Sequence, residues 1–188
     1  MQSNLILINR IFPTNGFATF VKNIFLIILG TILLTISSKI QVPFWPVPMT
    51  MQTFIVFIIG MSYGSRLALA TLVLYLLEGA IGLPVFAKGS GLIYLTGPTA
   101  GYLYGMMIAA WIVGMFSDLG YNKSYLKSFK SLIIGTFIIF LFGVGYLGSI
   151  IGFDKAIAVG LYPFLLSETF KILLAVALVP NIEKYINK

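Results

Sequence analysis

The sequence predicts an all-α integral membrane protein, a six-transmembrane-helix bundle with a short second helix. Hydrophobic residues make up 59% of the 188-residue chain and charged residues only 9%, whereas a water-soluble domain carries about 25% charged residues. Apolar runs close to the roughly 20 residues needed to cross a hydrocarbon core recur along the chain. We therefore expect a multi-pass protein of the cell (inner or plasma) membrane.

Residues 1–17 are expected to form an N-terminal tail or interfacial segment. They mix apolar and polar residues and lack the basic start and cleavage site of a signal peptide. Residues 18–188 then form a single six-helix membrane domain. Its predicted spans are Ala18–Ser38, Thr50–Met61, Arg66–Ile81, Thr99–Ser117, Leu132–Ile151 and Leu161–Val179.

Turn-forming residues delimit the first four spans. The first stops at the proline-rich stretch 41–48. The second begins at Thr50, a good helix-starting residue, but is short enough to form a re-entrant segment instead. The third ends in glycines, and the glycine-rich connection 82–98 leads to Thr99, which opens the fourth in the same way.

Polar sequence and a proline delimit the last two spans. The stretch Asp118–Ser131 is polar and separates the fourth span from the fifth. Pro180 is expected to help end the sixth, since proline cannot continue the hydrogen-bond ladder of a helix.

The cations support six spans with both termini in the cytoplasm. With that orientation eight cations lie inside and three outside, as the positive-inside rule requires. Those inside are Arg10, Lys22, Arg66, Lys123, Lys127, Lys130, Lys184 and Lys188. Those outside are Lys39, Lys88 and Lys155. The proline-rich and glycine-rich connections then face the exterior, which favours a site open to the outside.

Several function classes are disfavoured by composition. The chain has no cysteine and no histidine, so disulfides, the usual metal ligands and imidazole catalysis are absent, and we expect neither an enzyme nor a metal site. The net charge of +7 is spread without a dense basic patch, which argues against nucleic acid as a partner. Since no phosphate-binding Gly-Lys-Ser/Thr motif occurs, the chain cannot power ATP-driven transport alone.

Glu168 and Lys171 are the most informative polar residues. They lie at positions i and i+3 of the sixth span, so they project from one face of the helix. Ionisable residues at such depth are costly and usually face a cavity, a bundle interior or one another. They form either a structural ion pair or a ligand anchor in which Glu168 accepts from N–H groups and Lys171 donates to a carbonyl or carboxylate.

Other candidates each have two interpretations. Gln52 caps local backbone or meets a ligand. Trp45, between prolines, either anchors the chain at the membrane interface or belongs to a semi-rigid lid. Glu78 is expected to extend to the interface. Thr31 and Thr35 form a small-xxx-small pair that serves internal packing or contact with a partner subunit.

Four sequence blocks, in order and over nearly the whole chain, resemble the BioY family. They are Pro46–Thr53, Tyr75–Phe86 with its Gly-Leu-Pro-Val-Phe, Gly97–Tyr102, and Pro163–Lys171. The resemblance implies a biotin-binding S component of an energy-coupling-factor (ECF) transporter. It implies biotin held by six helices near the extracellular side beneath a mobile loop, here Gln41–Met49. It maps the family's last-helix acid and lysine onto Glu168 and Lys171, and its second-helix glutamine onto Gln52.

The resemblance also implies partners and shows departures. The partners are a transmembrane coupling subunit and cytoplasmic ATPases, with no cofactor in this chain and ATP used only by the partners. Glu168 stands where the family usually has Asp. Lys88 replaces a small residue and adds attraction for the biotin carboxylate. Thr31 and Thr35 stand where small alanines usually serve the partner contact.

Alternatives remain open at this point. One is a solitary biotin transporter that needs no ATPases. Another is a proton-coupled carrier of a different small anionic or zwitterionic solute, with Glu168 or Glu78 taking the proton. Biotin suits the residues because it combines two N–H donors and a carbonyl, an apolar thioether ring and an anionic tail.

Overall fold

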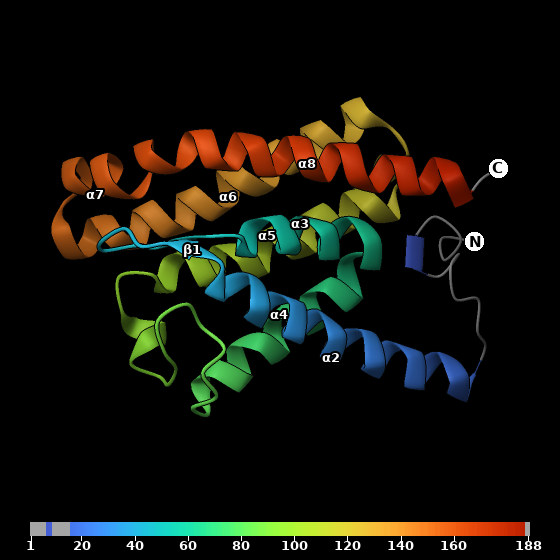
Figure 1. Ribbon diagram of the computed structural model, residues 1–188, viewed down its shortest axis with the longest axis horizontal. Helices are drawn as coiled ribbons and strands as arrows, with labels where there is room; N and C mark the ends of the chain where they lie inside the picture. The colour runs from blue at the N-terminus through green and yellow to red at the C-terminus, as the bar shows by residue number, and fades with distance from the viewer. Residues whose placement is uncertain (1–6, 9–15, 187–188) are drawn as a thin grey trace.

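Within residues 7–8 and 16–186, which the computed structural model describes, the protein is built from α-helices (Figure 1). Most of the expected tail 1–17 lies outside these residues. The long first helix, α2 (Phe17–Lys39), leads into a short antiparallel hairpin of β1 (Gln41–Val42) and β2 (Met49–Thr50). Gln41 pairs with Thr50 and Val42 with Met49. The proline-rich stretch is therefore the tip of a β-hairpin, which the all-α prediction did not include.

Helices α3 (Gln52–Tyr63) and α4 (Ser65–Ala80) are joined by Gly64 alone. Gly64 has a φ of 77°, a conformation that a residue with a side chain rarely adopts. The start of α4 is capped by Asp118, whose carboxylate accepts bonds from the Ser65 amide (3.2 Å) and hydroxyl. A carboxylate at this position satisfies a free amide of the first helical turn.

Helix α5 (Ala100–Asp118) lies at the centre of the bundle and packs against α3, α4 and α6. Its glycines allow the close approach to α6: a Cβ on Gly101 would lie 2.4 Å from the Phe142 carbonyl oxygen, and one on Gly105 would lie 3.0 Å from Ile139 Cα. Small residues at such crossings are the usual means of tight helix contact in membranes. Thr99 precedes the helix as expected, but its side chain makes no capping bond.

The last three helices are α6 (Tyr125–Ile151), α7 (Phe153–Gly160) and α8 (Tyr162–Ile186). Helix α6 begins seven residues before the predicted fifth span, so most of the polar stretch after Asp118 is helical or turn. Helix α7 was not predicted: it is a short amphipathic helix in the connection 152–160. Its eight residues are too few for a span.

The prediction that Pro180 helps end the sixth span is wrong, because α8 continues for six residues beyond it. Polar contacts hold this last part of the helix. Asn122 Nδ2 donates to the buried Glu183 at 2.7 Å, and Tyr125 donates to Asn181 at 2.5 Å. Asn181 Nδ2 also donates to the Ala177 carbonyl of the preceding turn at 2.7 Å.

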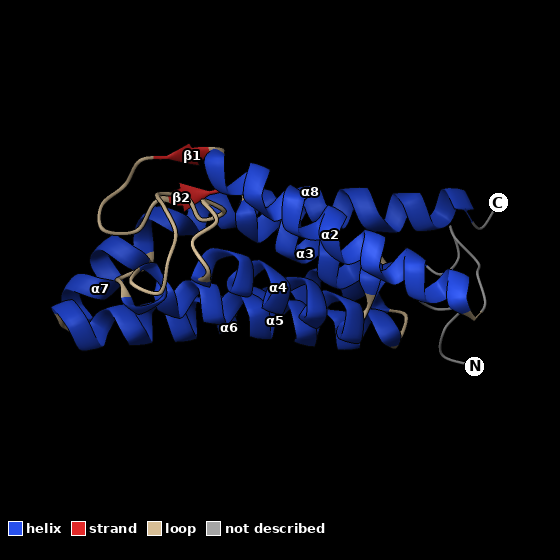
Figure 2. Cartoon of the chain, turned by 90° about the horizontal axis from the view of Figure 1, so that it is seen from below, coloured by secondary structure: helices blue, strands red, loops and turns tan. Residues whose placement is uncertain are grey.

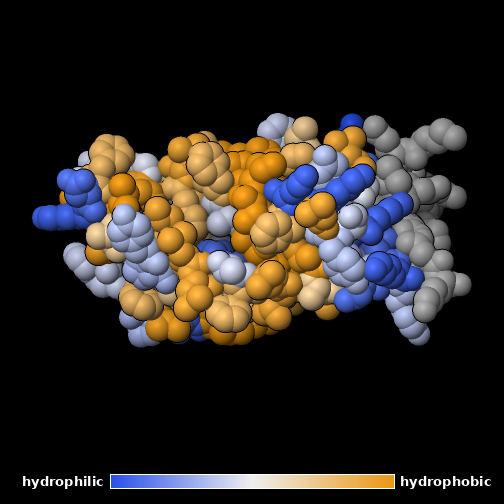
Figure 3. All heavy atoms as spheres, turned by 90° about the horizontal axis from the view of Figure 1, so that it is seen from above, coloured by the Kyte–Doolittle hydropathy of each residue, from blue (hydrophilic) through white to orange (hydrophobic). Residues whose placement is uncertain are grey.

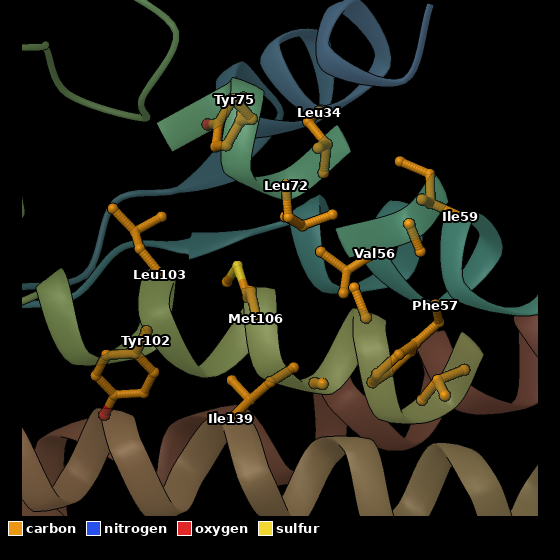
Figure 4. Packing of buried hydrophobic residues seen from close by; sticks show 14 of the residues in the cluster. Leu34, Val56, Phe57, Ile59, Leu72, Tyr75, Tyr102, Leu103, Met106 and Ile139 are labelled. Atoms are coloured by element: carbon orange, nitrogen blue, oxygen red, sulfur yellow. The ribbon is translucent and has the colours of Figure 1, made fainter. Parts of the chain in front are cut away.

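The core is formed where α2, α3, α4 and α5 meet (Figure 4). Leu34, Phe57, Leu72 and Tyr75 come from these elements and are at most 1% exposed. Two long connections between helices lie at one end of the bundle, which Figure 2 shows opposite the termini. We call this the hairpin end. It carries the β-hairpin, the connection 82–98 with its short 3-10 helix η2 (Tyr94–Thr96), and α7.

The surface has the pattern of a membrane protein. Apolar side chains cover the middle of the face in Figure 3, and hydrophilic ones gather toward both ends. Among the described residues, four helices, α2, α5, α6 and α8, are long and apolar enough to cross a membrane by length and composition. Helices α3 and α4 are shorter, with 12 and 16 residues. The helical class is thus confirmed and its long helices fit a membrane protein, and α3 and α4 lie at the residues of the predicted second and third spans.

Candidate functional site

A small cavity of about 40 Å³ lies within the hairpin end. Its wall combines the hairpin, the connection 82–98, and the adjoining turns of α3, α5, α6 and α8. Polar lining residues are Thr50, Gln52, Thr53, Thr99, Glu168 and Lys171. Aromatic ones are Tyr94, Tyr102, Phe140 and Phe164. Three of the predicted ligand-binding residues, Glu168, Lys171 and Gln52, are therefore brought together although 116 positions separate Gln52 from Glu168.

Glu168 and Lys171 form a buried ion pair on α8. Lys171 Nζ lies 2.6 Å from Glu168 Oε1, and the two residues are 3% and 4% exposed. Nζ also donates to the Thr50 carbonyl at 2.7 Å, and Thr53 Oγ1 donates to Glu168 Oε1 at 2.9 Å. Both interpretations of the pair thus have support, since the residues bind each other and line the cavity.

The second oxygen of Glu168 is the atom of this pair that is left without a partner. Within the described chain, Oε2 is buried and has no hydrogen-bond partner. Buried carboxylate oxygens are nearly always paired, because leaving one unpaired costs about 1–3 kcal/mol or more. The carboxylate can therefore accept a bond from an N–H or O–H group that reaches Oε2.

Gln52 is held at the start of α3 by its neighbours. Its Oε1 accepts from Thr50 Oγ1 at 3.2 Å, and its Nε2 donates to Tyr75 on α4 at 2.8 Å. The local capping interpretation is partly right, since the Gln52 backbone amide is bonded to Thr50 Oγ1 at 3.3 Å. The side-chain amide retains one further donor and one further acceptor site for another partner.

Aromatic side chains form a second part of the cavity lining, which we call the aromatic wall. Tyr102 and Phe164 are stacked with ring centroids 6.4 Å apart, and Phe140 meets both edge-on at 6.4 Å. The Tyr102 hydroxyl donates to the Gly160 carbonyl at the end of α7, so α7 supports this wall. These residues were not among the candidates predicted from the sequence. Tyr102 and Phe164 lie inside two of the four family-like blocks, and this position could have identified them.

Trp45 and Lys88 are predicted ligand-binding residues that do not line the cavity. Trp45 is 82% exposed at the tip of the hairpin. Lys88 is exposed and its Nζ lies 3.5 Å from the Phe44 carbonyl, so it reaches from the connection 82–98 to the hairpin. Their roles remain predictions that require the hairpin to move.

The predicted partner-contact residues differ in position. Thr31 is buried, and its hydroxyl lies 3.1 Å from Glu78 on α4, which joins the two helices. Thr35 is half-buried and donates to the Thr31 carbonyl. For Thr31 these contacts support the internal-packing interpretation.

Two further observations delimit the site. Among the described residues, no three Asp or Glu side chains converge in a way that could hold a metal ion. A larger groove of about 550 Å³ lies between α6 and α8, but apart from Thr136, Thr169 and Glu168 its lining is apolar or glycine. Lipid tails suit such a surface. We place the site in the smaller cavity because the polar side chains converge there.

Comparisons with known proteins agree on a family. The model of the BioY family matches residues 8–188. The "Probable biotin transporter BioY" of Pyrococcus horikoshii is 34% identical over 164 residues, covering 86% of this chain and 96% of that protein. The "Biotin transporter BioY" of Thermotoga maritima is 37% identical over 161 residues, covering 82% and 91%.

A solved structure shares the fold. The S component for biotin from an ECF-type ABC transporter superposes with a TM-score of 0.79 at 22% identity. The match covers 91% of this chain and 95% of that one. The helical architecture described above is therefore a fold that a solved structure already shows.

Proposed function

The chain belongs to the BioY family, and from this premise we propose that it binds biotin and serves its uptake as the S component of an ECF-type transporter. It is a transport protein and not an enzyme. The observation that carries the assignment of the site is the buried Glu168–Lys171 pair, which lines a cavity together with Gln52 and an aromatic wall and in which Glu168 Oε2 has no partner within the described chain.

In this proposal the ureido head of biotin lies against α8. One ureido N–H donates to Glu168 Oε2, and the Lys171 ammonium donates to the ureido carbonyl or the carboxylate. Charge-assisted bonds of this kind are about twice as strong as neutral ones. Tyr102, Phe140 and Phe164 face the apolar thioether ring. Lys88 attracts the anionic tail from the rim.

Ligand entry in this proposal depends on the hairpin. A cavity of about 40 Å³ is far smaller than the 300–1,000 Å³ of typical ligand sites. Val47, Pro48 and Thr50 form part of its wall, so movement of residues 41–50 is the most direct way to enlarge it. Trp45 then moves with the hairpin as part of a lid.

The proposal also includes the orientation in the membrane and the partner subunits. Six helices span the cell membrane with both termini in the cytoplasm, which exposes the hairpin end to the outside. A transmembrane coupling subunit and cytoplasmic ATPases supply energy, since the chain has no phosphate-binding motif of its own. Thr35 is the better placed of the two α2 threonines for contact with the coupling subunit, because it is only half-buried.

Calorimetric titration of the detergent-purified chain with biotin tests the cargo and the site. We expect tight, specific binding without ATP or a proton gradient. Glu168→Ala and Lys171→Ala are each expected to weaken it by at least about thirtyfold, because each leaves a buried charge unpaired. Lys155→Ala, which removes an exposed cation on α7, is the matched control and should bind normally.

The outcomes separate the claims. Normal affinity in both site variants would contradict the site, whereas no binding by folded wild-type protein would contradict the cargo. Uptake of labelled biotin in cells with and without the ATPases then tests energy coupling. Uptake that persists after their deletion would indicate a solitary transporter, and uptake abolished by a protonophore in ATP-replete cells would indicate proton coupling.

A further inference from the structure

A chain of buried hydrogen bonds leads from the cavity to the connection 82–98. Gln52 lines the cavity, and its Nε2 donates to the Tyr75 hydroxyl oxygen at 2.8 Å. The Tyr75 hydroxyl donates in turn to the Val85 carbonyl oxygen at 2.9 Å. Gln52 is 4% exposed and Tyr75 only 1%, so water does not compete for these bonds. Tyr75 itself does not line the cavity.

The acceptor at the end of the chain sets the direction of every bond in it. A backbone carbonyl can only accept, and a phenol has a single proton, so Tyr75 gives its proton to Val85 and must accept from Gln52. The group of Gln52 that faces Tyr75 is therefore its NH₂. Its amide oxygen must lie at the other end, beside the Thr50 hydroxyl at 3.2 Å, and Thr50 also lines the cavity.

The connection 82–98 does not depend on Tyr75 alone. Ser38 Oγ lies 2.8 Å from the same Val85 oxygen, and Lys39 Nζ lies 2.5 Å from the next carbonyl, that of Phe86. Phe86 is fully buried against Gly79 of α4. Removing the Tyr75 hydroxyl therefore releases the Gln52 amide while other contacts still hold the backbone of residues 85–86.

We infer that Tyr75 is a positioning residue: it fixes the orientation of the Gln52 amide so that Gln52 presents an acceptor, alongside Glu168 Oε2, to a ligand with two N–H donors. The inference rests on the proposed function, since the ureido group of biotin has two such donors. A site with two fixed acceptors discriminates against analogues that lack one N–H, because Gln52 then loses its bond to the ligand or Glu168 Oε2 is left buried and unpaired.

A double-mutant cycle tests this inference. Biotin is titrated into purified full-length wild-type, Tyr75→Phe, Gln52→Ala and doubly substituted protein, each with its melting temperature recorded. We expect Tyr75→Phe to weaken binding by roughly three- to tenfold, the equivalent of about one hydrogen bond. Gln52→Ala should weaken it at least as much. Tyr75→Phe should then add nothing in the Gln52→Ala background, because residues that act through one contact are not additive.

Tyr63→Phe is the matched control. Tyr63 is also a buried tyrosine that donates to a backbone carbonyl, that of Leu26 at 3.1 Å, but it does not line the cavity. It should bind biotin as the wild type does. Desthiobiotin, which keeps the ureido group and lacks the sulfur, should show the same loss with Tyr75→Phe as biotin shows.

Two results would overturn the inference while leaving the proposed function intact. One is wild-type affinity in Tyr75→Phe. The other is an equal loss from Tyr75→Phe with and without Gln52, which would mean that the hydroxyl acts through the connection 82–98. Gln52→Leu gives an independent test from the other side of the bond, and unchanged affinity there would also overturn it. If folded wild-type protein binds no biotin, the proposed function itself fails.

Discussion

At the scale of single residues, the two oxygens of Glu168 have opposite environments. Oε1 is bonded to Lys171 at 2.6 Å and to Thr53 at 2.9 Å, whereas Oε2 has no partner in the described chain. Because a carboxylate is rigid and planar, the two contacts of Oε1 determine where Oε2 points. Thr53 is therefore part of the site even though its hydroxyl is already occupied.

Thr53→Val is expected to weaken biotin binding by roughly three- to tenfold, because the loss of about one hydrogen bond lets the carboxylate turn. The shape of the side chain is nearly retained, so the melting temperature should change little. Calorimetry of the purified variant measures the effect. Thr71→Val is the control, since Thr71 is buried on α4 and its hydroxyl donates to the Leu67 carbonyl of its own helix. Equal affinities in both variants would refute this role of Thr53.

At the scale of secondary-structure elements, the end of α5 locks the turn between α3 and α4. Asp118 caps α4 through Ser65, and Gly114 lies directly against the same residue. A Cβ on Gly114 would be 2.6 Å from the Ser65 Cα and amide nitrogen, which are backbone atoms that cannot swing aside. The turn at Gly64 thus depends on the absence of a side chain on a different helix.

Gly114→Ala is expected to destabilise the protein by about 1–3 kcal/mol, the usual effect of overpacking. It should lower the melting temperature in detergent and leave biotin affinity unchanged, since Ser65 and Gly114 do not line the cavity. Gly145→Ala on α6 is the matched control, because a Cβ there meets no atom within 4 Å. A melting temperature no lower for Gly114→Ala than for Gly145→Ala would contradict the packing argument.

At the scale of the whole molecule, the bundle has two chemically different ends. The hairpin end carries the cavity, the proline-rich and glycine-rich connections and α7. The opposite end carries the basic residues of η3 (Tyr121–Lys123) and of the first turns of α6, together with Lys184 near the end of α8. This polarity is what the positive-inside rule associates with a cytoplasmic face.

Cysteine labelling tests this orientation directly, because the chain has no cysteine of its own. Lys155→Cys on α7 should react with a membrane-impermeant maleimide in intact cells. Lys130→Cys near the start of α6 should react only after permeabilisation, and both positions are exposed in the structure. The reverse pattern would invert the proposed topology, and labelling of both in intact cells would contradict the six-span arrangement.

Much of this architecture was predictable because helices that face lipid must be apolar, so that their positions appear as runs of high hydropathy in the sequence. The spans around α2, α3, α4 and α5 were predicted to within two residues of their observed bounds. The errors concern helices whose presence or length depends on contacts with residues distant in the sequence. Helix α7 is too short to give a hydropathy signal, and the C-terminal part of α8 survives Pro180 through contacts with Asn122 and Tyr125 on distant elements.

Only the charged and polar residues of the site could be predicted from the sequence. Glu168 and Lys171 were identifiable because charges within a span are rare, and Gln52 because it lies in a family-like block. Phe140 gave no such signal: one aromatic residue among many in an apolar helix gains its place in the wall only from the packing of α5, α6 and α8. Tyr75 likewise depends on a contact with Gln52 across 23 residues of sequence.

The small volume of the cavity affects both the affinity for biotin and the rate at which biotin is captured. If biotin is accommodated only after the hairpin has moved, the hairpin must spend part of its time displaced, and only that fraction of molecules is competent to bind. The apparent dissociation constant is then the intrinsic one divided by the competent fraction. Two lysines hold the hairpin in its observed position: Lys171 donates to the Thr50 carbonyl and Lys88 to the Phe44 carbonyl. Both therefore influence the rate of biotin binding as well as the affinity.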